Sequence, residues 1–182
     1  MNNQVHSALS GTETHKNLTE AFGSEARSAM RYRIFSKLAK EHGDPILSEM
    51  LKNISDNEAE HAELWLDYLG ETDGNTKNLE AQLASEEYEA NAMYPDFSAT
   101  ARKEGFSEIA DKMMYAANSE KGHMALINNY LEKIRNGTLY TSDNDDTEWI
   151  CTNCGYTHTG RTAPERCPLC SHTERYFVKN DN

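Results

Sequence analysis

The chain has 182 residues, of which 37% are hydrophobic and 26% are charged, and its formal net charge is −12. This acidic balance argues against a nucleic-acid or anionic-membrane partner, because either would repel the chain. The length allows one domain of about 140 residues with a small appendage. No stretch approaches the ~20 apolar residues of a membrane span, and the first residues lack the apolar core of a signal peptide, so we expect a cytoplasmic protein.

The first half of the chain predicts two helices. Apolar residues recur at helical spacing over residues 16–42, until the sequence "HGDP" ends the run. A second helix is predicted to begin at Pro45, where Asp44 can cap it, and to continue to Gly70.

Two further helices and a short tail follow. The third helix is predicted over residues 79–105, with a kink or break at Pro95, which lacks a backbone donor. The fourth helix is predicted over residues 107–136 and ends before Gly137. Residues 141–146 ("TSDNDD") have the composition of a linker, and the tail beyond them is too short to build a core without a metal or disulfides.

Carboxylates and imidazoles lie on the apolar faces of these helices. Two Glu-x-x-His pairs occupy the second and fourth helices, namely Glu58 with His61 and Glu120 with His123. The first and third helices contribute Glu25, Glu86 and Glu89. Other glutamates fall off these faces or far from the centre, and we expect them to be solvated: Glu60, Glu63, Glu80, Glu87, Glu104 and Glu108.

A bound cation explains these inward carboxylates better than chance. One Glu-x-x-His pair in an acidic helix is usually a surface pair, but here two copies share their setting with facing glutamates. Buried carboxylates are costly unless they are paired or bind metal. A carboxylate from each of two helices and Glu-x-x-His from each of the other two form the ligand set of di-iron four-helix bundles. We therefore predict a di-iron site.

The four cysteines form a second metal motif. Cys151 and Cys154 are separated by two residues, as are Cys167 and Cys170, and this double C-x-x-C pattern suits one tetrahedral ion. Four thiolates suit iron and zinc alike. Disulfides are the alternative, which we disfavour for a chain without a secretory signal.

The tail sequence "EWICTNCGYTHTGRTAPERCPLCSH" resembles the rubredoxin-like domain of rubrerythrins. The sequences "AFGSEARSAMRY", "DNEAEHA", "SEEYEANAMYPDF", "EGFSEIA" and "SEKGH" resemble the rubrerythrin bundle. The resemblance implies a mainly α fold, in which a ferritin-like four-helix bundle (residues 1–140) is followed by an acidic linker (141–146) and a small rubredoxin-like metal-ribbon domain (147–182).

The resemblance also implies an activity and a set of roles. Rubrerythrins are non-haem di-iron peroxidases that reduce hydrogen peroxide to water, with electrons relayed from NAD(P)H by separate reductases or a rubredoxin through the single iron of the tail. By position, Glu58 and Glu120 would bridge the two irons and Glu25 and Glu86 would be terminal ligands. His61 and His123 would complete the two shells, and Glu89 would exchange with the histidine of the second helix. Tyr32 and Tyr94 match tyrosines that lie beside the metal ligands in the family, although each can equally be a core aromatic residue.

The connection between the second and third helices predicts a dimer. In the family these helices run parallel, which demands a crossover, yet this chain offers only residues 71–78, which stretch to about 28 Å against a helix of about 37 Å. We therefore expect a homodimer in which the first two helices pair with the last two of a second chain. A simple up-down-up-down bundle is the competing fold.

Three other functions stay open on the sequence alone. A ferroxidase or iron-binding protein of the ferritin type would use the same bundle but gives no reason for the tail. A zinc-ribbon scaffold leaves the inward glutamates unexplained. Reduction of dioxygen by the same centre also stays open.

Overall fold

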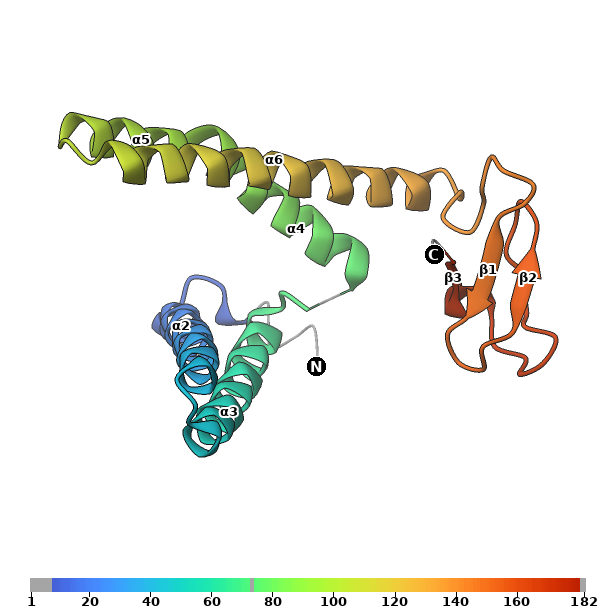
Figure 1. The fold of residues 1–182 in the computed structure, drawn as a ribbon, viewed down its shortest axis with the longest axis horizontal. Coiled ribbons are helices and arrows are strands. Elements are labelled where there is room, and N and C mark those ends of the chain that lie inside the picture. Colours follow the sequence, from blue (N-terminus) through green and yellow to red (C-terminus); the bar gives the residue numbers. More distant parts are fainter. Residues whose placement is uncertain (1–7, 73, 181–182) are drawn as a thin grey trace. The chain divides into compact units, whose positions relative to one another are not determined.

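The computed structural model describes residues 8–72 and 74–180. They form two compact units, which divide between Asn78 and Leu79 and are each described by themselves (Figure 1). Among the described residues, none of the helices is long and apolar enough to cross a membrane.

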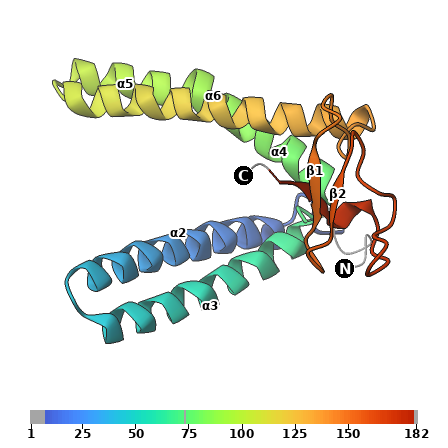
Figure 2. The same cartoon turned by 45° about the vertical axis from the view of Figure 1, so that its right-hand side comes forward.

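The first unit is an antiparallel helical hairpin of α2 (Glu13–Glu41) and α3 (Pro45–Leu69), shown along its length in Figure 2. As the sequence predicts, the Asp44 side chain caps α3 by accepting the Leu47 N–H at 2.9 Å. Gly70 ends α3 in the left-handed conformation, with φ of 77°. The Ser55 hydroxyl donates to the Ala29 carbonyl at 2.9 Å, which joins the two helices midway.

Helix α4 (Asn75–Tyr88) begins four residues before the second unit and runs into it. With the π-helix η1 (Glu89–Met93) and α5 (Tyr94–Lys103) it forms one interrupted helix. It packs beside α6 (Ser107–Arg135). The buried Ser98 hydroxyl on α5 donates to the Ala110 carbonyl on α6 at 2.9 Å. The fourth helix therefore has the predicted ends, whereas the third begins four residues before the predicted Leu79.

The π-helix is the form that the predicted break at Pro95 takes. Proline lacks the N–H that an α-helix requires, and its ring crowds the carbonyl four residues earlier. The Tyr94 N–H instead donates to the Glu89 carbonyl, five residues earlier, and this wider turn precedes Pro95. The helix thus continues through the proline with one wide turn, and that turn begins at Glu89.

The tail is a three-stranded antiparallel sheet in the order β2-β1-β3, formed by β1 (Glu148–Cys151), β2 (Thr157–Thr159) and β3 (Phe177–Lys179). A short 3₁₀ turn, η2 (Glu174–Tyr176), leads into β3. Trp149 and Phe177 are 1% and 2% exposed and pack with the cysteines, so the metal motif forms much of this small core.

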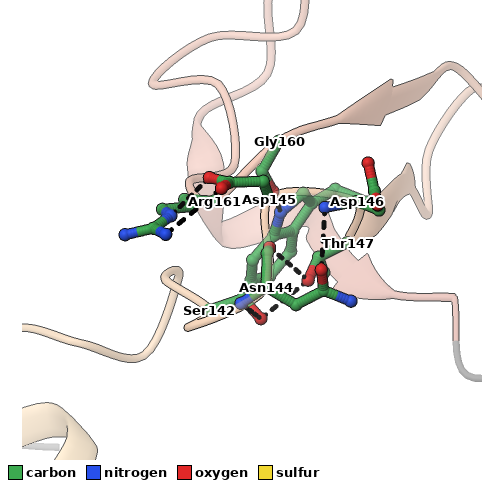
Figure 3. Close-up of polar contacts among 8 residues, drawn as sticks. Ser142, Asn144, Asp145, Asp146, Thr147, Gly160 and Arg161 are labelled. Atoms are coloured by element: carbon green, nitrogen blue, oxygen red, sulfur yellow. Dashed lines mark hydrogen bonds and ion pairs between the residues drawn. The ribbon is translucent and has the colours of Figure 1, made fainter.

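The acidic residues 141–146 are folded against the tail (Figure 3). The Ser142 N–H donates to the Arg161 carbonyl at 2.7 Å, and the Arg161 guanidinium pairs with Asp145. The Thr147 hydroxyl donates to the Ser142 hydroxyl oxygen at 2.7 Å. A composition typical of a flexible linker therefore forms an ordered turn, because its short polar side chains satisfy one another and the backbone.

Candidate metal centres

The first unit brings together three of the predicted ligands. Oxygens of Glu25 on α2 and of Glu58 on α3 lie 3.9 Å and 3.7 Å from the Nδ1 of His61. One ligand atom from each residue lies within 4.8 Å of the others. Two carboxylates and one imidazole on facing helices are the donors that iron uses in proteins.

The Glu25 carboxylate of this cluster is perturbed by its neighbours. Hydrogen bonding to Glu58 and partial burial raise the pKa of Glu25, and the neighbouring His61 opposes that rise. Two carboxylates held this close are costly when both are ionised, and a cation between them removes the repulsion. The arrangement therefore favours metal binding.

The second unit repeats the arrangement. The Nδ1 of His123 lies 2.7 Å from a Glu120 oxygen on the same helix and 3.2 Å from a Glu86 oxygen on α4. The hydrogen bond that the His123 ring donates to Glu86 raises the pKa of His123, burial lowers it, and Glu120 raises it further. Both carboxylate side chains are 14% exposed, whereas the His123 side chain is 51% exposed. The carboxylates of this cluster are thus largely buried, and its imidazole is exposed.

The remaining predicted bundle residues lie outside these clusters. Glu89 begins the π-helix, and its Oε1 accepts a hydrogen bond of 3.2 Å from the Ser85 hydroxyl. Tyr32 on α2 and Tyr94 at the start of α5 are both half-buried. Sequence reasoning passed over Ser85, although its position one helical turn before Glu89 was a usable signal. The glutamates expected to be solvated are exposed, as predicted: Glu60, Glu63, Glu80, Glu87, Glu104 and Glu108.

The four cysteines converge as free thiols. The Sγ atoms of Cys151 and Cys170 are 3.7 Å apart, and those of Cys154 and Cys167 are 3.6 Å apart. A tetrahedron with metal–sulfur bonds of about 2.3 Å has edges of about 3.8 Å, so the cage already has the size that a zinc or iron ion requires. The disulfide alternative is wrong for this structure.

Backbone amides and neighbouring thiols set the acidity within this cage. The Tyr156 amide lowers the pKa of the Cys154 thiol, but burial and the other three thiols raise it to about 12. Burial raises the pKa of Cys167, but the amides of Cys170 and Leu169 bring it down to about 7. Metal binding requires all four thiolates, so loading the site releases protons.

Each cysteine pair closes with the same turn. The Gly155 N–H donates to the Cys151 carbonyl and the Ser171 N–H donates to the Cys167 carbonyl, both at 2.8 Å. Gly155 and Ser171 both adopt the left-handed conformation, with φ of 75° and 62°. Ser171 is the single non-glycine residue with positive φ among those the structure describes.

The helical hairpins carry two clusters, each with two glutamates and a histidine, and a sheet with four cysteines follows them. This combination defines a ferritin-like di-iron protein with an electron-transfer domain. The chain belongs to the rubrerythrin family. The family described as Rubrerythrin matches residues 16–131 and 77–145, and the rubredoxin-like domain of rubrerythrin matches residues 149–178.

Similar proteins agree with this assignment. The chain is 36% identical to a putative rubrerythrin of Methanocaldococcus jannaschii, over 91% of each chain. It is 33% identical to rubrerythrin of Nitratidesulfovibrio vulgaris and 34% identical to rubrerythrin-1 of Clostridium acetobutylicum, in both cases over 93% of this chain and 95% of the relative. A solved structure of partially reduced nigerythrin is 25% identical over 92% of this chain and 86% of that one, with a TM-score of 0.35, which is too low to support an argument about the fold.

Family membership defines the cofactors. They are two iron ions in a carboxylate-bridged site and one iron held by four cysteines. The donor sets fit them, because carboxylate and imidazole donors suit redox-active iron and the four thiolates suit a tetrahedral ion. The chain is therefore a di-iron oxidoreductase of oxidative-stress defence.

Proposed function

We propose that the chain reduces hydrogen peroxide to water, with electrons that pass through the four-cysteine iron. The observation that carries this proposal is that one chain contains both carboxylate–histidine clusters and a preformed cysteine cage. Iron storage needs no electron-transfer site, whereas a peroxidase must be reloaded after every turnover. The domains would be the bundle (1–140), the acidic segment (141–146) and the cysteine domain (147–182).

The two clusters would supply matching halves of one di-iron site. Each has the ligands for one ion, namely two carboxylates and one imidazole. The bridging ligands would be Glu58 and Glu120, the terminal ligands Glu25 and Glu86, and the histidines His61 and His123. Glu89 would be the carboxylate that exchanges with His61.

Reduction of peroxide consumes two protons and two electrons and yields two water molecules. The bound iron ions would supply the two electrons at the site. Protein groups that are not iron ligands must hold protons nearby. The phenol groups of Tyr32 and Tyr94 would donate hydrogen bonds at the edge of the site. The electrons would come from NAD(P)H through a separate reductase or rubredoxin.

The site would be shared between two chains. Only residues 70–74 connect α3 to α4, a shorter connection than the sequence predicted, and it reaches about 20 Å when extended. Helix α3 has 25 residues and is therefore about 37 Å long. The connection is too short to return along α3, so parallel α3 and α4 in one bundle require a second copy of the chain.

The composition of the helical cores supports the same conclusion. Among the described helical residues, those that are buried are alanines, two serines and one leucine. Large apolar side chains stay exposed instead, including Met50 at 50%, Ile109 at 51% and Leu126 at 72%. Hairpins that bury small residues and expose large ones need a facing surface, which a second copy would provide.

Anaerobic single-turnover experiments test the activity. The iron-loaded protein is fully reduced, peroxide equal to the di-iron sites is added, and the visible spectrum is recorded with time. The ferric tetrathiolate colour should appear as peroxide disappears. No peroxide consumption, or no oxidation of the tail as peroxide is consumed, would overturn the proposal.

A matched pair of variants on α6 makes the test specific. Glu120→Gln should abolish peroxide-driven oxidation of the tail, whereas Glu108→Gln, at an exposed position of the same helix, should behave like the wild type. Equal loss in both variants would show a general effect of helix charge and would count against the assigned ligand.

A further inference from the structure

The carboxylate of Glu89 is held apart from the nearest metal cluster. Glu86, Glu120 and His123 bring their ligand atoms within 4.8 Å of one another, and Glu89, on the next turn of the same helix as Glu86, is not among them. Its Oε1 instead accepts the hydrogen bond of 3.2 Å from Ser85, in a half-buried position.

The geometry of the helix shows which way this bond pulls. At about 100° per residue, Glu89 projects between Ser85 and Glu86 around the helix axis, and Ser85 lies on the side away from Glu86. A bond to Ser85 therefore draws the Glu89 carboxylate around the helix, away from Glu86.

The hydroxyl of Ser85 has an alternative partner. Thr19 on α2 and Thr100 on α5 each donate to the carbonyl four residues earlier, at 3.0 Å, which is the common local bond for a helical hydroxyl. Ser85 gives its single hydroxyl proton to Glu89. A carboxylate is the stronger acceptor, so this bond is stronger than the local one.

The two ends of the bond lie on different kinds of backbone. Ser85 belongs to the regular helix α4, whereas Glu89 opens the π-helix. A π-helical turn has a wider hydrogen-bonding pattern and frequently accompanies functional sites. The donor, Ser85, thus lies on regular α-helix, and the acceptor, Glu89, lies at the start of an irregular turn.

We propose that Ser85 is a positioning residue that holds the Glu89 carboxylate in a hydrogen bond and sets how readily it replaces His61 as a ligand. The inference rests on the proposed role of Glu89 as an exchanging ligand. Binding of Glu89 to metal would require its carboxylate to leave the Ser85 hydroxyl, so the hydrogen bond and the coordination compete. Ser85 would thereby tune the balance between the two positions of Glu89.

Cobalt binding to the full-length, metal-free protein tests this competition. Cobalt at the carboxylate clusters gives weak visible bands whose intensity reports coordination number, and cobalt at the cysteines gives intense thiolate bands. Ser85→Ala should tighten cobalt binding at the carboxylate site by about tenfold, the effect of removing one competing bond to a charged group. It should also weaken the visible bands as coordination number rises, and leave binding at the cysteines unchanged.

Two further variants separate this role from a structural one. Ser85→Thr keeps the hydroxyl and should restore wild-type affinity and spectrum. In a Glu89→Gln background, Ser85→Ala should have no effect, because the competing ligand is gone.

The outcomes distinguish the inference from the function on which it rests. If Glu89→Gln weakens cobalt binding and Ser85→Ala leaves it unchanged or weaker, the positioning role is wrong and the ligand role of Glu89 stands. If neither Glu89→Gln nor Ser85→Ala changes binding, both are wrong. If cobalt binds only to the cysteines, the di-metal site itself is wrong.

Discussion

A site shared between two chains predicts that two inactive variants complement each other. Glu58→Gln removes a proposed ligand from the α2–α3 hairpin, and Glu120→Gln removes one from α6. In the proposed dimer, each site combines the α2–α3 hairpin of one chain with the α4–α6 hairpin of the other. A mixed dimer would then have one site with both changes and one site with neither.

The size of the effect follows from this geometry. The purified mixed dimer should keep about half of the wild-type peroxide turnover and half of the bundle iron, because one of its two sites is intact. Dimers from a random equal mixture should keep about one quarter, since about half of them are mixed. Each variant alone should be inactive.

Co-expression with two different tags and purification on both gives the mixed dimer, in which peroxide consumption and iron content are measured. Inactive mixed dimers would refute the shared site, because sites formed within one chain leave each chain with one defective site. The control pair Glu60→Gln and Glu108→Gln, at exposed positions of α3 and α6, should give full turnover.

Three other predictions concern the helices and the second cluster. Gly122→Ala should raise the free energy of unfolding by about 0.5–1 kcal/mol, because an added Cβ meets nothing within 4 Å. Gly23→Ala should raise it by less, because its Cβ meets an arginine side chain at 3.2 Å. Urea denaturation measures both changes. Ser98→Ala should lower that free energy by about 1 kcal/mol through loss of the bond to α6, whereas an equal loss in exposed Thr100→Ala would contradict this explanation. In the metal-free protein, His123 should titrate above its ordinary pKa of about 6.5. Its contribution to stability is therefore complete below that pH and is lost as the pH rises through the raised pKa. An imidazole NMR titration that shows a lowered pKa would refute this.

Local rules explain why much of the fold could be read from the sequence. Asp44, Pro45 and Gly70 mark the two ends of α3, and each acts through its own backbone or side chain. The cysteine cage was equally accessible, because the spacing of each C-x-x-C pair brings two thiols together within a few residues. The clusters of Glu25, Glu58 and His61 and of Glu86, Glu120 and His123 followed from their helical faces.

Other features depended on contacts that spacing does not encode. Helical periodicity placed Glu89 on the face of Glu86, but it did not show the wide turn that begins at Glu89. Composition indicated an acidic linker at residues 141–146, but it did not show that Arg161, fifteen or more residues further on, contacts that segment. The sequence by itself determined which residues can bind metal, since that depends on chemical type and local face. Tertiary structure decided how closely they converge, because that depends on how the helix faces pack, and the sequence does not specify the distance in space between those faces.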